Sequence, residues 1–88
     1  MKYAIDPARV QWRIVDGEAV VVDVDSTYYY GLNRTGTFVW SLLADRTMSR
    51  DEIVAGVAAE YGKRPAEVEA DVAALLAELA REQLIEER

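Results

Sequence analysis

Carboxylates and hydroxyls are the main side chains here that could carry acid–base or nucleophilic chemistry, because the sequence has no histidine and no cysteine. The commonest general base and metal ligand is therefore missing, and disulfides and thiolate zinc sites are excluded. Most of the sixteen acidic residues lie in first turns of expected helices or in the C-terminal tail, where capping and solvation explain them. Ser49 suits a helix cap, Ser26 lies in an expected turn, and Ser41 has no histidine to activate it. We therefore expect no enzyme, no cofactor and no metal site.

The overall composition indicates a small globular domain. The chain has 88 residues, about half of them apolar, and we expect one domain over residues 1–88. Its net charge of −6 disfavours nucleic acid as a partner. No stretch approaches the roughly 20 apolar residues of a membrane span, and the first residues lack the apolar core of a secretory signal. We expect a cytoplasmic protein with no membrane contact.

The stretch from Tyr28 to Leu43 is the element around which the rest is organised. Tyr28–Leu32 predicts a strand, because aromatic residues favour a pleated, half-buried surface. Asn33 can then cap a helix over about Arg34–Leu43. The apolar residues expected to fill the core at this corner are Leu32, Phe38, Val39, Trp40 and Leu43.

Two further strands precede this corner, after an irregular lead-in over residues 1–9. Val10, Trp12 and Ile14 alternate with polar residues, and Val20, Val22 and Val24 alternate beyond the turn signal Asp16-Gly17. A two-residue turn would place Trp12 opposite Val21. A three-residue loop through Glu18 would instead pair Ile14 with Val20, Trp12 with Val22 and Val10 with Val24. We favour the second register because it puts all these apolar residues on one face.

The turn at Asp25-Ser26-Thr27 leads into the third strand, in which Tyr28, Tyr30 and Leu32 point inward and Tyr29 points to the other face. Two more helices follow. Ser49-Arg-Asp-Glu52 forms a capping box and Gly62 suits the end of that helix, while Pro65 suits the first turn of a helix running to about Glu82. The fold class is thus α+β and winged helix-turn-helix-like: a three-stranded antiparallel meander followed by three helices.

The third strand of such a meander has one unpaired edge, which can accept an extended peptide. The apolar stripe of the third helix is mainly core, yet it spans too wide an arc for one partner, so part of it could face a guest peptide. The arc comprises Val68, Asp71, Val72, Leu75 and Leu76. A winged-helix DNA-binding protein is the alternative, but it needs a basic third helix, and five acids and one base lie between Pro65 and Glu82. The same edge can also pair with a second copy of the chain.

The order of landmarks resembles the PqqD-like family of peptide chaperones. The resemblance rests on Tyr30-Gly-Leu-Asn-Arg-Thr-Gly36, Val39-Trp40 and Leu42-Leu43, followed by Glu52-Ile53, Tyr61, Asp71-Val72, Leu75-Leu76, Leu79 and Leu84-Ile85. It runs from about Val10 to Glu86. The segment Ala80-Arg-Glu-Gln83 departs from the Gly-Leu-Leu ending that is usual in the family.

The resemblance implies a recognition element for the leader of a ribosomally made precursor peptide. Such a domain binds the leader as an added strand and delivers it to a modifying enzyme. This chain is most similar to the standalone leader-binding subunits of lasso peptide systems, whose partner is a leader peptidase, and the peptide chaperone of pyrroloquinoline quinone biosynthesis is the alternative. The implied binding residues are Tyr28, Tyr29, Tyr30, Gly31, Leu32, Val68, Asp71, Val72, Leu75 and Leu76, with Asp71 holding a polar or cationic leader group.

Overall fold

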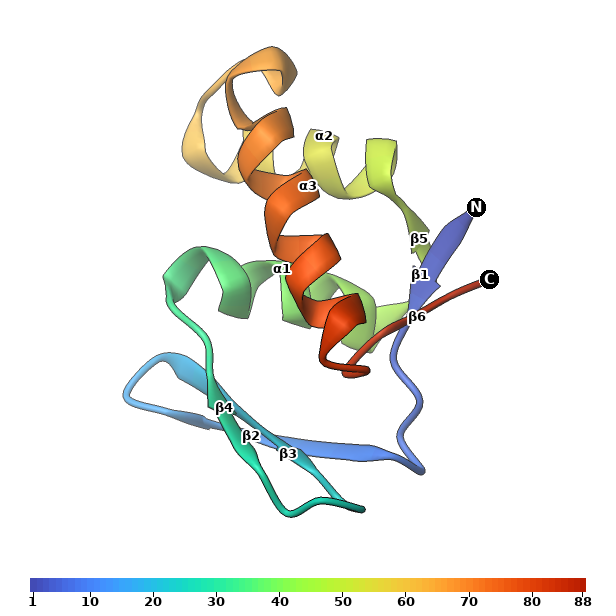
Figure 1. Cartoon of the computed structure of the whole chain (residues 1–88). Coiled ribbons are helices and arrows are strands. Elements are labelled where there is room, and N and C mark those ends of the chain that lie inside the picture. The colour runs from blue at the N-terminus through green and yellow to red at the C-terminus, as the bar shows by residue number, and fades with distance from the viewer.

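The computed structural model describes all residues from 1 to 88. Three helices pack on one face of a three-stranded sheet, and a second small sheet joins the chain ends (Figure 1). In chain order the elements are β1 (Lys2–Ala4), β2 (Val10–Val15), β3 (Glu18–Asp23), β4 (Tyr29–Gly31), α1 (Arg34–Asp45), β5 (Met48–Ser49), α2 (Arg50–Tyr61), α3 (Pro65–Arg81) and β6 (Glu86–Glu87). The expected α+β arrangement, a meander followed by three helices, is confirmed. None of the helices is both long and apolar enough to cross a membrane.

The main sheet has the strand order β2-β3-β4, and its register differs from the one that we favoured. Trp12 lies opposite Val21, so the turn has two residues and the three-residue loop is wrong. Asp16 and Gly17 have φ angles of 53° and 81°. Positive φ at both central positions is typical of the tight hairpin turn that Asp-Gly favours, and its twist matches that of the strands. This local turn chemistry outweighs the alternation of Val20 and Val22, which lie half-buried on the outer face.

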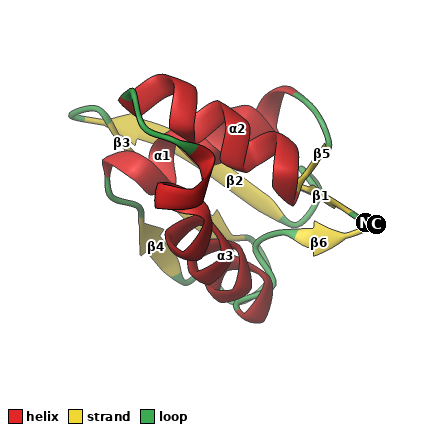
Figure 2. Ribbon diagram, turned by 90° about the horizontal axis from the view of Figure 1, so that it is seen from above, coloured by secondary structure: helices red, strands yellow, loops and turns green.

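Two other expectations near this sheet are corrected. Tyr28 was expected to point into the core, but β4 begins only at Tyr29 and the side chain of Tyr28 is 67% exposed. The lead-in is not irregular throughout, because residues 2–4 form β1 between β5 and β6. Backbone bonds of 2.8 and 2.7 Å join Lys2 and Arg88 in both directions, so the chain ends lie side by side (Figures 1 and 2).

Local signals define the helix ends as the sequence indicates. The Asn33 side chain accepts a hydrogen bond of 2.8 Å from the Gly36 backbone N–H at the start of α1. Ser49 and Glu52 form the reciprocal capping box of α2, and Gly62 ends that helix in the left-handed conformation with φ 63°. Pro65 opens α3. After α3, Gln83 adopts a φ of 60° at the position where glycine would be favoured.

The core is one cluster of sixteen buried residues between the helices and the inner face of the main sheet. Trp40 of α1 is 1% exposed and packs edge to face on Trp12 of β2, with ring centroids 5.6 Å apart. From α3 the buried residues are Val68, Val72, Leu76 and Leu79. Leu84 and Ile85 fold back onto the core, as expected. This packing fixes how α3 lies relative to β4.

Candidate functional site: a groove between strand β4 and helix α3

Strand β4 pairs on one side only, with β3. Backbone bonds run from Asp23 to the carbonyl of Tyr28 and from Leu32 to the carbonyl of Ala19, at 3.1 and 2.9 Å. In an antiparallel ladder every second residue bonds the partner strand, so the backbone N–H and C=O groups of Tyr30 also point toward β3. The N–H and C=O groups of Tyr29 and Gly31 therefore point outward, away from β3. They form an open edge that could bond another strand.

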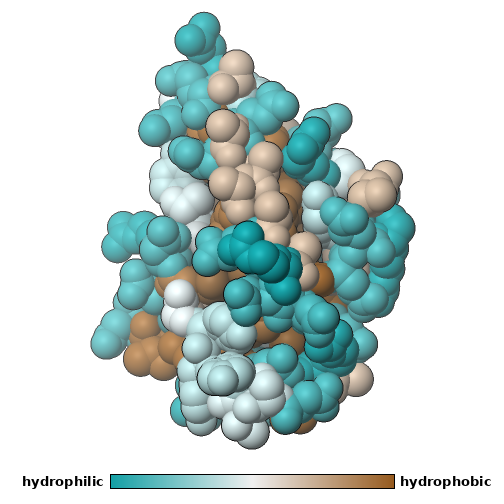
Figure 3. Space-filling view, in the orientation of Figure 1, coloured by the Kyte–Doolittle hydropathy of each residue, from teal (hydrophilic) through white to brown (hydrophobic).

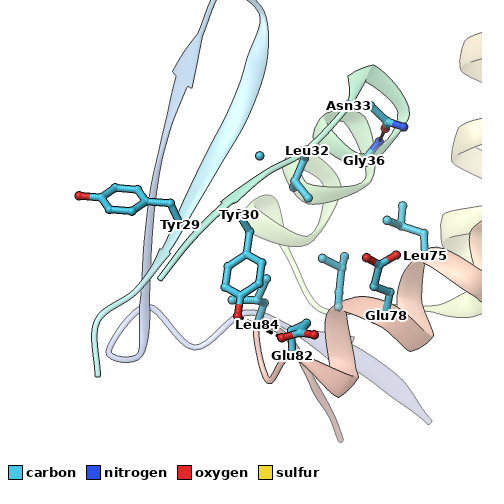
Figure 4. Close-up of a pocket in the computed structure, with 11 residues that line it drawn as sticks. Tyr29, Tyr30, Leu32, Asn33, Gly36, Leu75, Glu78, Glu82 and Leu84 are labelled. Atoms are coloured by element: carbon cyan, nitrogen blue, oxygen red, sulfur yellow. Dashed lines mark hydrogen bonds between the residues drawn. The ribbon is translucent and has the colours of Figure 1, made fainter. Parts of the chain in front are cut away.

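A cavity of about 430 Å³ lies between this edge and the C-terminal half of α3 (Figure 4). Its lining residues are Tyr29, Tyr30, Gly31, Leu32, Asn33, Gly36, Leu75, Glu78, Leu79, Glu82 and Leu84. We call this cavity the β4–α3 groove. In the orientation of Figure 1, apolar surface shows between hydrophilic residues where the helices meet the sheet (Figure 3). The groove thus combines an apolar floor with a strand whose backbone is free to bond.

The side chains of β4 alternate between its two faces. Tyr30 lies opposite the fully buried Val21 and points across the groove toward α3 (Figure 4). Tyr29 points to the opposite side of the sheet, lies opposite Val22, and is 73% exposed. Gly31 leaves the outer face bare, and a Cβ built on it would meet no atom within 4 Å. A side chain of a guest strand paired with β4 would therefore find room on the outer face beside Gly31.

The charged residues that line the groove are both acidic. Glu78 and Glu82 stand on α3 and just beyond its end, and the Tyr30 hydroxyl donates a hydrogen bond of 3.0 Å to Oε2 of Glu82. That hydrogen bond, together with burial and the charge of Glu82, raises the pKa of Tyr30 above its ordinary value. No basic residue lines this groove. Its electrostatic character therefore favours a cationic or neutral guest.

The structure brings together only some of the residues expected to bind a peptide. Tyr29–Leu32 and Leu75 line the β4–α3 groove, whereas Leu76 is 1% exposed and belongs to the core. Val68, Asp71 and Val72 instead line a separate cavity of about 110 Å³ together with residues from α1, α2 and the segment between α2 and α3. Tyr28 lines neither cavity.

Several lining residues were not anticipated. They are Asn33, Gly36, Glu78, Leu79, Glu82 and Leu84. Leu75, Glu78, Leu79 and Glu82 follow the spacing i, i+3, i+4, i+7, so they form one stripe along α3 and the residue that ends it. The spacing of that stripe is readable in the sequence, but the sequence does not show that the stripe faces the edge of β4.

Residues 18–85 match the family model described as Coenzyme PQQ synthesis protein D (PqqD). The chain belongs to the PqqD family. The match includes β3, β4, all three helices and every residue of the β4–α3 groove. The predicted family resemblance is thereby confirmed. No curated protein sequence matches the chain.

Two solved structures are similar to this PqqD-family chain. TbiB1 in complex with the TbiA(beta) leader peptide is 32% identical, with a TM-score of 0.85, over 97% of this chain and 96% of the other. The PqqD truncation of Methylobacterium extorquens PqqCD is 22% identical, with a TM-score of 0.78, over 98% of this chain and 89% of the other. Its NMR structure represents a stand-alone recognition element for ribosomally synthesised and post-translationally modified peptides. This second likeness establishes the fold alone.

Proposed function

We propose that this protein is a non-catalytic binding module for the leader region of a ribosomally synthesised precursor peptide. The observation that carries the proposal is the open edge of β4 beside an apolar cavity. Peptides that add a strand to a sheet gain affinity from main-chain hydrogen bonds and specificity from alternate side chains in pockets. The β4–α3 groove offers both. The leader-bound TbiB1 structure, at 32% identity, supports this assignment.

In the proposed complex, the leader lies along β4 and bonds the outward N–H and C=O groups of Tyr29 and Gly31. Side chains on adjacent strands share a face when they lie opposite one another. The leader residue opposite Tyr30 therefore enters the groove, and its two neighbours lie on the outer face beside Tyr29 and Gly31. This geometry is the same for a parallel and an antiparallel leader.

The pathway that we propose is lasso peptide biosynthesis, with delivery of the bound precursor to a leader peptidase or another modifying enzyme. The higher identity to TbiB1 favours it. A second candidate is the peptide chaperone of pyrroloquinoline quinone synthesis, which the description of the family names. Neither assignment involves nucleic acid or a membrane, and the glutamates of the groove make a phosphate backbone an unsuitable guest.

The test is an amide-proton NMR titration of the full chain with a leader peptide encoded in the same gene neighbourhood. We expect shifts concentrated at residues 29–33 and 75–84, with little change at Val68 and Asp71. A peptide of the same composition in scrambled order is the control. If millimolar leader shifted no amide of the groove, or shifted the same amides as the scrambled peptide, the proposal would be rejected for that leader. Broadening of β4 without peptide would indicate self-association through the edge.

A further inference from the structure

The β4–α3 groove differs in chemistry between its two ends. Leu75 lies toward Leu32 and the start of α1, whereas Glu82 lies beside the Tyr30 hydroxyl at the other end, with Glu78 between them (Figure 4). Leu79 and Leu84 add apolar surface to the cavity. The groove therefore has an apolar end and a carboxylate end along the direction that a guest strand would follow.

We infer that the groove selects a leader carrying an apolar residue and a Lys or Arg two positions apart, both facing α3. The inference rests on the proposed function and specifies the peptide that the same site takes. Side chains two residues apart on a strand share a face. When one guest residue lies opposite Leu32, the next inward residue lies opposite Tyr30. The first meets Leu75 and the second meets the carboxylates of Glu78 and Glu82.

The two carboxylates have no basic partner within the chain. The ion pairs of the structure join Arg64 to Glu67 and Arg88 to Glu86, at other places on the surface. The Tyr30 hydroxyl bonds Oε2 of Glu82, which holds that carboxylate at the groove and leaves its second oxygen free to accept from a guest. A guest ammonium or guanidinium group would be the first cation at this position.

Local helix electrostatics disfavours acids at these two positions. Glu78 and Glu82 are four residues apart near the C-terminal end of α3, so like charges face each other where the helix dipole is already negative. Residues that oppose the local preference of their element are characteristic of functional sites. Arg81 is the one basic residue in the last turn, and a cationic guest side chain would offset these penalties further.

The cavity also suits the shape of a long basic side chain. Lysine and arginine lay their aliphatic stems along apolar surface and keep the charged head near water or a counter-charge. Leu79 and Leu84 can contact the stem, and the carboxylates stand at the exposed rim. An acidic guest residue at this position would meet only like charge.

The test measures leader affinity by isothermal titration calorimetry with the leader encoded in the same gene neighbourhood. Glu78→Gln and Glu82→Gln remove the charges and keep the side-chain shapes, and the amide oxygen of the Glu82→Gln variant can still accept from Tyr30. We expect each to raise Kd about two- to fivefold at low salt, with a smaller effect at high salt. Glu69→Gln is the matched control, because Glu69 is exposed on α3 outside the groove, and it should change Kd less than the groove variants.

A charge swap tests the contact directly. Each Lys and Arg of the leader is changed in turn to Glu, and one such peptide should bind Glu82→Lys better than it binds the wild type. Unchanged affinity of the Glu78→Gln/Glu82→Gln double variant would overturn the cation subsite while leaving leader binding intact. A wild-type protein that bound no leader would instead reject the proposed function, and the subsite with it.

Discussion

The Tyr30 hydroxyl donates a hydrogen bond of 3.0 Å to Oε2 of Glu82, which joins β4 to the residue that follows α3. These residues are 52 positions apart in the sequence and belong to opposite walls of the groove. The bond orients a carboxylate over the cavity without neutralising its charge. The width of the groove at this end and the proposed subsite for a cation therefore depend on the same contact.

The Tyr30–Glu82 bond should make stability depend on alkaline pH. The pKa of Tyr30 is raised in the folded protein, above an ordinary value of about 10 for tyrosine. The stabilising contribution is then complete below about pH 10 and is lost as the pH rises through the raised pKa. The difference in free energy of unfolding between wild type and Tyr30→Phe should shrink above pH 10 in urea titrations. Tyr28→Phe controls for loss of an exposed hydroxyl, and a Tyr30→Phe difference that stayed constant to pH 11 would contradict the bond.

Proline at Gly31 should weaken strand addition while keeping the fold. The Gly31 N–H points away from β3, and proline is tolerated on edge strands where the N–H faces solvent. The leader carbonyl that would accept a hydrogen bond from the Gly31 N–H is then unpaired, so the Kd of the leader should rise at least about fivefold. Gly31→Ala keeps the amide N–H and adds a methyl group that meets no atom within 4 Å, so this variant should bind the leader with the Kd of the wild type. Equal Kd values for the proline and alanine variants would argue against main-chain bonding at β4.

Adjacent leucines on α3 should separate binding from stability. Leu75 is half-buried and lines the groove, whereas Leu76 is 1% exposed and lies in the core. Leu76→Ala should lower the free energy of unfolding by about 2–5 kcal/mol, and Leu75→Ala should cost less stability but weaken leader binding. Urea denaturation and calorimetry on the same samples measure both quantities. If Leu75→Ala bound leader as tightly as the wild type, the apolar end of the groove would be assigned incorrectly.

Trp40 should be essential for folding. It is 1% exposed and packs against Trp12, so truncation to alanine should cost about 3–5 kcal/mol, much of the stability of a small domain. Trp12→Ala should cost less because Trp12 is already 37% exposed. Circular dichroism in increasing urea compares the two variants with wild type. If the unfolding midpoint of Trp40→Ala equalled that of the wild type, the assignment of Trp40 to the core would be wrong.

The capping box of α2 should make stability depend on acidic pH. The Ser49 backbone N–H donates to Glu52 at 2.9 Å and lowers the pKa of that carboxyl below its ordinary value. The contribution of this bond to the free energy of unfolding is therefore fully present above the pKa of about 4.3 in the unfolded chain. It is lost as the pH falls through the lowered pKa of the folded protein. Glu52→Gln keeps an acceptor but does not titrate, so its stability deficit should vanish toward pH 2. Glu69→Gln provides the comparison, and a deficit for Glu52→Gln that persisted at pH 2 would contradict the effect.

The hairpin register shows that two signals in the sequence can disagree. Asp16-Gly17 favours a two-residue turn, while the valines at 20, 22 and 24 favour the shifted register that we chose. The turn decides because the buried face of β3 is filled by Ala19 and Val21, each 0% exposed, and by Asp23 at 9%, and the tip of the hairpin lies in solvent. The small sheet of β1, β5 and β6 carried no comparable signal, since strands of two or three residues are defined only by their partners.

Sequence reasoning alone predicts the helices and their ends, because Asn33, Ser49, Gly62 and Pro65 act through contacts within about four residues. It also predicts the family and the existence of a free strand edge. Which side of α3 faces that edge depends instead on tertiary packing. Helical periodicity defines faces, but the packing of Leu76 and Leu79 into the core rotates the helix about its axis. That rotation places Glu78 and Glu82 in the groove and turns Asp71 toward α2.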